Sequence, residues 1–269
     1  MGHNGMRPLL APAEIESRAE EVGLTKVALP LGRTFALAVL AGAFIALGGA
    51  FMLVVRADAS LPFAASQVLG GLVFCLGLFL VLVAGAELFT GNCLMVCGLL
   101  SGRYGAGRVL RNWCAVYAGN AVGAVAIACL LWISGFFDAG SGAVGAAAVS
   151  VALSKASLAP LAAFTKAVLC NMLVCLAVWM GFSGQTVTDK LAAAILPVTA
   201  FVALGFEHSI ANLFFLPLGL IAQAAGVSGA GALGLGGVAA NLVVVTAGNI
   251  AGGVLIGALY WYAYARRDA

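Results

Sequence analysis

Two apolar runs in this chain are too long to cross a membrane once, and each is interrupted by a short polar segment. One run covers about residues 67–100 and contains ELFTGN at 87–92, and the other covers about 190–222 and contains EHSIAN at 207–212. A membrane span needs about 20 apolar residues. Inside lipid, backbone that leaves a helix must face protein or a water-filled cavity, and an unpartnered Glu, His or Asn is costly. Both interruptions are therefore predicted to be sites rather than loops.

Composition indicates the class of protein. Of the 269 residues, 63% are hydrophobic and only 9% are charged, whereas a soluble domain carries about 25% charged residues. The chain is therefore predicted to be a polytopic membrane protein in contact with the lipid bilayer. Its net charge of +3 is small and spread out, so nothing indicates nucleic-acid binding. The seven cysteines lie mostly in apolar runs, where a thiol acts as a small hydrophobe, and no metal site or cofactor is expected.

Six segments are expected to span the membrane, which makes the predicted fold all-α. They cover about residues 34–55, 67–100, 112–136, 158–182, 190–222 and 235–264. The polar segment 1–30 lacks the apolar core of a signal peptide, and its residues 11–26 are expected to form a short amphipathic helix at the membrane face. Residues 31–265 are expected to form the membrane domain, followed by a tail at 266–269.

Basic residues predict the orientation of the spans. With six spans both termini lie on one side, and ten Lys and Arg residues fall on that side against two, Arg56 and Lys155, on the other. The ten are Arg7, Arg18, Lys26, Arg33, Arg103, Arg108, Arg111, Lys190, Arg266 and Arg267. Because Lys and Arg are enriched in cytoplasmic loops, both termini are predicted to be cytoplasmic. Lys166 falls inside the fourth span, and the sequence indicates no partner for it.

The chain carries two related halves. Both interruptions consist of a Glu, four further residues and an Asn, and they lie 120 residues apart. Asn112 and Asn241, which lie 129 residues apart, each stand eight residues before the Asn of an Ala-Gly-Asn. We interpret these matches as a duplication of about residues 31–136 and 155–265. Three spans per half is an odd number, so the halves must be inverted, and paired broken helices in inverted halves indicate a transport site near the membrane midplane.

A helix that breaks inside the membrane exposes backbone N–H and C=O groups. The N-terminal end of its second part carries partial positive charge and suits an anion. Glu87 and Glu207 are duplicated between the halves, which favours a structural task, and each is expected to accept hydrogen bonds from backbone N–H groups of its break. Four other polar side chains are expected to satisfy freed backbone groups: Thr90, Asn92, Ser209 and Asn212.

Two residues of the second half have both a structural and a functional interpretation. His208 is the only histidine outside the polar N-terminal stretch. It is either a core histidine bonded to a neighbouring carbonyl or hydroxyl, or a donor of a proton or hydrogen bond to a passing anion. We favour the second, because imidazole titrates near neutral pH. Lys155 is either an ordinary interfacial lysine or a charge that concentrates anions at a pore mouth.

Other activities find little support in the sequence. Residues 229–234 (GAGALG) fit a dinucleotide-binding pattern, but no strand precedes them. His208 and Ser209 are adjacent, and adjacent helical residues do not face each other, so they are poorly placed as a catalytic pair. The sequence contains no HExxH motif. An enzyme is not expected, and a structural or receptor subunit would not need duplicated broken helices.

Several motifs resemble signatures of one family of membrane proteins. They are AELFTGN at 86–92, NMLVCLAVW at 171–179, GFEHSIAN at 205–212, and Gly248-Asn249 followed by Gly252-Gly253. On these motifs the chain resembles the formate/nitrite transporter family over about residues 10–265. The resemblance implies an aquaporin-like fold of six helices with the second and fifth broken, a pore in each protomer, a homopentamer and a location in the bacterial inner membrane.

The resemblance also implies roles for individual residues. Thr90 and His208 match the residues that hydrogen-bond the substrate in a central chamber. Lys155 matches a vestibule lysine, and Asn171 and Asn249 match pore asparagines. Two apolar constrictions are implied, formed on the inward side by Leu78, Phe89 and Val174 and on the outward side by Phe74 and Phe201.

The implied function is the passage of a small monovalent anion of a weak acid. The anion is drawn to a positive vestibule and meets an apolar constriction that is costly for an ion to enter. Because burial disfavours the charged form, it is expected to take a proton, directly or through water linked to His208, and to cross as the neutral acid. A pure anion channel is the rival mechanism.

The substrate is less well defined by the sequence than the mechanism. Formate is favoured, and nitrite and hydrosulfide are alternatives. The FTGN of residues 89–92 differs from the Phe-Thr-Ser-Thr associated with the enterobacterial formate channel, which gives these alternatives some weight.

Overall fold

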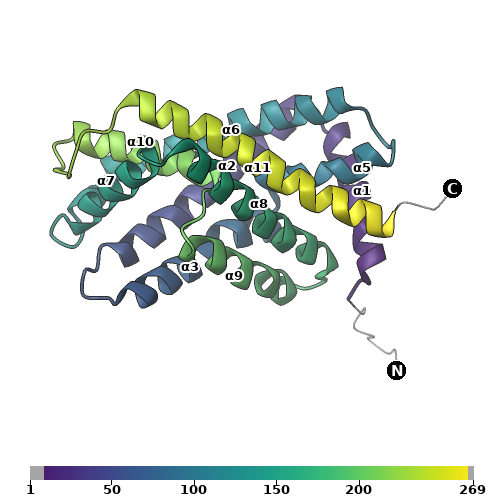
Figure 1. Cartoon of the computed structure of the whole chain (residues 1–269), viewed down its shortest axis with the longest axis horizontal. Helices are drawn as coiled ribbons and strands as arrows, with labels where there is room; N and C mark the ends of the chain where they lie inside the picture. The colour runs from purple at the N-terminus through teal and green to yellow at the C-terminus, as the bar shows by residue number, and fades with distance from the viewer. Residues whose placement is uncertain (1–8, 266–269) are drawn as a thin grey trace.

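Helices joined by short loops account for most of the chain (Figure 1). The computed structural model describes residues 9–265, so the tail at 266–269 lies outside the described residues, as do Arg7, Arg266 and Arg267. Within residues 9–265, five helical segments are long and apolar enough to span a membrane: α2 (Leu31–Arg56), Phe63–Gly85, α6 (Ala106–Ile133), α8 (Pro160–Ser183) and α11 (Leu235–Tyr264). The all-α, multi-pass class is confirmed, but the count of six spans is not, because the fifth expected span is divided into two shorter helices.

The second expected span is broken, as the sequence predicts. It begins as α3 (Phe63–Leu80), widens into a π-type turn (Val81–Gly85) and passes through extended backbone at 86–88. Helix resumes as α4 (Phe89–Asn92) and continues through a 3-10 turn (Cys93–Met95) into α5 (Val96–Leu100).

The fifth expected span has the same design. It consists of α9 (Val187–Ala203), a break at 204–208 and α10 (Ser209–Ala224). Gly85 and Gly205, which lie 120 residues apart, have φ angles of 81° and 66°, a region that glycine enters without the steric cost of a Cβ. Both breaks are shorter than the sequence motifs, because the second part of each motif already forms the first helical turn after the break.

The two halves have corresponding helices. The pairs are α2 with α8, α3 with α9, and α6 with α11, and α2 packs along α6 as α8 packs along α11. A Cβ at Gly123 of α6 would overlap the carbonyl of Val39, and a Cβ at Gly252 of α11 would overlap that of Val168. Small residues at these matched positions let the helix backbones touch.

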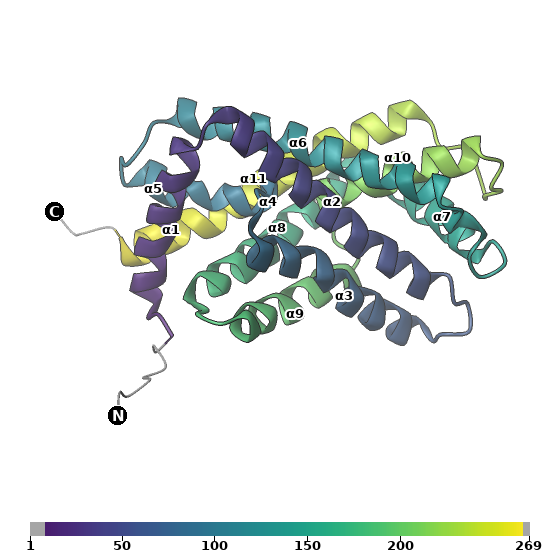
Figure 2. The same ribbon diagram turned by 180° about the vertical axis from the view of Figure 1, so that it is seen from behind.

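One helix pair is only half anticipated by the sequence. α1 (Pro12–Ala28) covers the expected amphipathic helix, but its counterpart α7 (Ala143–Ala156) is not among the predicted elements. At 14 residues α7 is too short to span, and its sequence of small apolar residues carries no helix-start signal. α7 and the α10–α11 connection lie at one end of the molecule, opposite α1, α5 and the end of α11, while α4 lies between the two ends (Figures 1 and 2).

Candidate functional site

The two breaks meet through one pair of side chains. Thr90, in the first turn of α4, places its Oγ1 2.9 Å from Nε2 of His208, the residue that precedes α10. The exposed fractions are 0% for Thr90 and 3% for His208. The structure thus brings together, across 118 residues of sequence, the two residues that the resemblance assigns to substrate binding.

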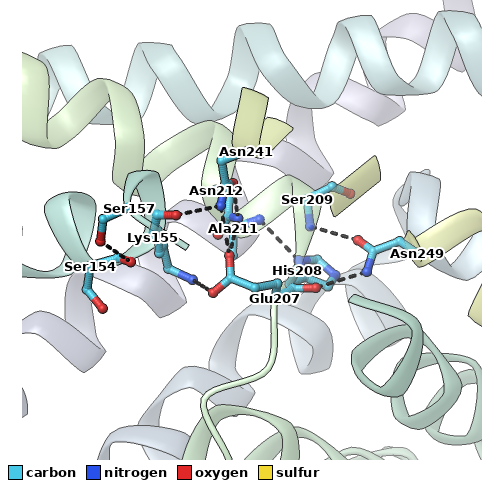
Figure 3. Close-up of polar contacts among 10 residues, drawn as sticks. All are labelled: Ser154, Lys155, Ser157, Glu207, His208, Ser209, Ala211, Asn212, Asn241 and Asn249. Atoms are coloured by element: carbon cyan, nitrogen blue, oxygen red, sulfur yellow. Dashed lines mark hydrogen bonds and ion pairs between the residues drawn. The ribbon is translucent and has the colours of Figure 1, made fainter. Parts of the chain in front are cut away.

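The hydrogen bonds of His208 define the protonation of its ring. The residue caps α10, and its Nδ1 accepts a hydrogen bond from the backbone N–H of Ala211 at 3.0 Å (Figure 3). A nitrogen that accepts carries no proton, so this pattern assigns the neutral ring with its proton on Nε2. Nε2 then donates to Thr90 Oγ1, which leaves the Thr90 hydroxyl with its own proton to donate.

A buried carboxylate stabilises the first break through side-chain partners. Glu87 accepts from Nζ of Lys26 at 2.6 Å and from Nδ2 of Asn92 at 2.7 Å. Lys26 belongs to α1, so this helix contributes a charge to the break. Asn92 Nδ2 also donates to Oδ1 of Asn112 at 2.8 Å.

The second break repeats these contacts. Glu207 accepts from Nζ of Lys155 at 2.9 Å and from Nδ2 of Asn212 at 2.7 Å, and Asn212 also donates to Oδ1 of Asn241 at 2.8 Å (Figure 3). The sequence-based prediction that the glutamates accept from backbone N–H groups is wrong, since the partners are an ammonium and an amide. A carboxylate in a low-dielectric site is stabilised by an opposite charge.

Asn120 satisfies the backbone groups that the first break frees. Its Oδ1 accepts from the N–H of Phe89 at 3.0 Å, and its Nδ2 donates to the carbonyls of Ala38 at 2.7 Å and Glu87 at 2.9 Å. One side chain on α6 thus ties both sides of the break to α2.

Asn249 does the same at the second break. Its Oδ1 accepts from the N–H of Ser209 at 2.8 Å, and its Nδ2 donates to the carbonyl of Glu207 at 2.9 Å (Figure 3). Its Nδ2 also donates to the carbonyl of Ala167 at 2.8 Å. The role implied for Asn249 by resemblance was that of a pore asparagine, and here all three of its hydrogen bonds go to backbone.

These contacts overturn the prediction that Thr90, Asn92, Ser209 and Asn212 satisfy the freed backbone groups. Asn92 and Asn212 bond to carboxylates, Thr90 bonds to His208, and Ser209 Oγ is buried without a partner within residues 9–265. The sequence contained the signal for the correct residues, because the Ala-Gly-Asn repeat ends on the asparagines at 120 and 249.

Asn171 links the first turn of α4 to the asparagine on α11 that ties the second break. Its Nδ2 donates to the carbonyl of Thr90 at 3.2 Å and to that of Asn249 at 2.7 Å. Its Oδ1 is buried and has no partner among residues 9–265. An unsatisfied buried acceptor is costly in a dry interior, so this oxygen is a candidate for binding a water or a protonated substrate.

Aromatic rings close the site on the side of the second break. Phe74 and Phe201 meet edge to face with ring centroids 5.8 Å apart, and Phe201 stacks on His208 at 5.7 Å. Of the two residues assigned by resemblance to the outward constriction, Phe201 therefore lies directly against the His208 ring and Phe74 lies against Phe201.

The residues assigned to the inward constriction have different surroundings. Leu78 and Val174 are buried. The ring of Phe89 packs on Trp113 and Tyr117 of α6, with centroid distances of 6.1 and 5.0 Å. Packing against α6 accounts for the Phe89 side chain, and its place in a constriction rests on the resemblance alone.

A cavity of about 370 Å³ leads to this site. Its lining includes His208, the rings of Phe74, Phe201 and Phe215, and residues of α7. The charged side chains that line it are Arg56, Lys155, Lys166 and Glu207. A cavity with three cationic groups and one carboxylate concentrates anions.

Comparison with known proteins agrees with this geometry. The profile of the formate/nitrite transporter family matches residues 13–263. The formate channel FocA of Escherichia coli K12 is 38% identical over 274 residues, covering 97% of this chain and 96% of that protein. A probable formate transporter of Methanothermobacter thermautotrophicus is also 38% identical, over 94% of this chain and 97% of its own length.

Solved structures show the same arrangement of helices. A pentameric formate channel with formate bound superposes with a TM-score of 0.77 at 34% identity, covering 88% of this chain and 98% of that one. An ion channel of the same family gives a TM-score of 0.79 at 31% identity, over 94% and 98%. Sequence and fold match along nearly the whole length, and we conclude that this chain belongs to the formate/nitrite transporter family.

Proposed function

We propose that the chain is a channel for small monovalent anions of weak acids and that formate is its substrate. The observation that carries the proposal is the buried Thr90–His208 pair beside a cation-lined cavity. The solved relative with formate bound and the curated formate channels support the choice of formate, and nitrite and hydrosulfide are the alternatives.

The mechanism follows from the polarity of this path. The cations attract the anion, and the Phe74 and Phe201 rings deprive it of water, which makes it more basic. The anion takes a proton and passes as the neutral acid, with the Thr90 hydroxyl donating a hydrogen bond to it. Because both ring nitrogens of His208 are occupied, the proton comes from the outer solution and reaches the anion through water in the cavity, and His208 fixes the direction of the Thr90 hydroxyl.

The wider organisation of the channel is part of the proposal. Five copies assemble, as in the pentameric relative, and each contributes its own pore. Both termini lie in the cytoplasm of a bacterial cell, because most of the basic residues lie on their side. The cavity that reaches His208 then opens outward, and Leu78, Phe89 and Val174 form the inward constriction.

A flux panel tests the substrate. The reconstituted protein is expected to admit formate into liposomes faster than nitrite and hydrosulfide at equal concentration, and liposomes without protein supply the baseline. Equal rates for all three anions would be consistent with an anion channel but would rule out formate as the preferred substrate. If none of the three enters faster than baseline, the proposed function fails.

Two substitutions at His208 test whether the imidazole is needed for flux. His208→Asn keeps an acceptor that caps α10 but removes the imidazole, whereas His208→Phe removes both. With the neutral-acid mechanism, both variants are expected to pass substrate more slowly, and uptake by the unaltered protein rises as the pH falls. A rate that is independent of pH and unchanged in His208→Phe would favour the pure anion channel.

A further inference from the structure

The cationic side chains that line the outward cavity differ in whether a carboxylate neutralises them. Lys155 Nζ is paired with Glu207 at 2.9 Å, and Arg56 hydrogen-bonds the neutral side chain of Gln67. Lys166 also lines the cavity, and its Nζ makes no hydrogen bond or ion pair with any residue between 9 and 265. The site described above therefore leaves one ammonium group unused.

The duplication shows that this ammonium is not needed to hold the break. Lys166 accepts a hydrogen bond from the N–H of Glu207 through its backbone carbonyl, and Leu37 accepts from the N–H of Glu87 in the same way. Leu37 and Lys166 are 129 residues apart, the spacing that also relates Lys26 to Lys155. Because Leu37 accepts this backbone hydrogen bond without a charged side chain, the ammonium of Lys166 is not needed for it and is a feature of the second half alone.

This addition changes the electrostatics of one end of the pore. Within each half the charges of the glutamate and its lysine cancel: Lys26 neutralises Glu87, and Lys155 neutralises Glu207. Lys166 and Arg56 then give the outward cavity its excess of positive charge. The Lys166 ammonium lies about 4.0 Å from where a Cβ on Gly205 would stand, next to the break that carries His208.

We propose that Lys166, rather than Lys155, captures the substrate anion before it meets the Phe74 and Phe201 rings. An ammonium on a flexible stem recognises charge without the directional fork of a guanidinium. Lys166 therefore raises the local concentration of any small monovalent anion and does not select among them. This inference rests on the proposed anion-channel function and specifies which side chain recruits the substrate.

Uptake kinetics with Lys166→Met and Lys166→Arg test the inference. Cells without their own formate channels carry the full-length protein, and initial formate uptake is measured against external concentration at low and high ionic strength. Lys166→Met is expected to raise the half-saturating concentration roughly three- to tenfold at low salt, because local charge of this kind enhances encounter, with the maximal rate unchanged. Screening by salt removes most of the difference, and Lys166→Arg keeps the original value.

Lys190→Met is the matched control. It removes the same charge at the start of α9, outside the cavity, where Lys190 donates to the carbonyl of Leu82, and the half-saturating concentration is expected to stay constant. An unchanged half-saturating concentration in Lys166→Met, or a lower maximal rate alone, would overturn the inference. Absence of formate uptake in the unaltered protein would instead remove the function on which it rests.

Discussion

The two breaks share the same pattern of hydrogen bonds and ion pairs but differ in the polarity of several equivalent residues. In each break the chain passes through a glycine with positive φ. An asparagine side chain with three hydrogen bonds ties each break to neighbouring helices. Each break also holds a glutamate between a lysine and an asparagine. The equivalent positions also include pairs that differ in polarity, among them Leu88 with His208, Thr90 with Ile210, and Leu37 with Lys166.

This comparison separates scaffolding from function. The repeated residues solve a problem that any broken helix in lipid has, which is to satisfy its freed backbone groups. An apolar residue occupies the position equivalent to His208, Thr90 or Lys166 in the other half, and of these three side chains only His208 satisfies a freed backbone group, the N–H of Ala211. Thr90 from one half and His208 from the other hydrogen-bond to each other, so the substrate path that we propose lies where the two halves differ.

The largest expected effect comes from the glutamates. Glu87→Gln and Glu207→Gln each strand a lysine, Lys26 or Lys155, and loss of one partner of a buried ion pair costs about 3 kcal/mol or more. We expect similar losses of thermal stability in detergent for both. Neutralising the lysine as well, as in Glu87→Gln with Lys26→Met, is expected to recover part of the loss. A large loss at only one glutamate would break the equivalence of the two breaks.

Next in size are the asparagines that tie the breaks. Asn120→Ala and Asn249→Ala each remove the side-chain partner of one N–H and one carbonyl of the break, and also a hydrogen bond to a neighbouring helix, and an unsatisfied buried group costs about 1–3 kcal/mol. Both variants are expected to melt at lower temperature and to yield less assembled protein on size-exclusion chromatography. If Asn249→Ala melted like the unaltered protein, the scaffolding role of this residue would be refuted.

For the Thr90–His208 pair, which is not repeated in the two halves, we expect a substitution to change flux rather than stability. Thr90→Val removes the hydroxyl that we assign to the substrate, and formate uptake into liposomes is expected to fall roughly tenfold, about 1.4 kcal/mol, near the upper value for a neutral hydrogen bond. The matched change in the other half, Ile210→Val, trims a buried apolar side chain and is expected to leave uptake unchanged. Equal losses in the two variants would count against a special role for Thr90.

The smallest expected effect concerns the helices that carry the two lysines. α1 carries Lys26 and also Glu16, whose pKa is raised from 4.5 to about 7, first by burial and then by the charge of Glu20. A raised pKa means that the docked helix holds the proton more tightly, so this stabilisation is present below pH 4.5 and is lost as the pH rises through 7.

Hydrogen exchange tests whether the stability of α1 depends on pH while that of α7 does not. Amides of α1 are expected to exchange faster, relative to their intrinsic rates, at pH 8 than at pH 5, whereas those of α7 keep the same protection. Glu16→Gln is the control, because it removes the titrating group and is expected to make α1 protection independent of pH. A pH dependence that persisted in this variant would exclude Glu16 as the cause.

The sequence by itself determined the membrane class, the positions of both breaks and the duplication. Each of these depends on local composition and spacing: a long apolar run must lie in lipid, and a Glu and an Asn within it must mark a site. The relation of His208 to Thr90 followed only from the resemblance to a known family, because no local pattern indicates a contact across 118 residues.

Only the tertiary structure decided which side chain satisfies which group. Glu87 and Glu207 bind lysines from α1 and α7, and Asn120 and Asn249 reach the freed backbone from α6 and α11. Hydrogen bonding is directional and acts within about 3 Å, so the choice among several nearby polar partners depends on how helices distant in sequence pack. The same packing leaves Lys166 facing the cavity without a partner among residues 9–265.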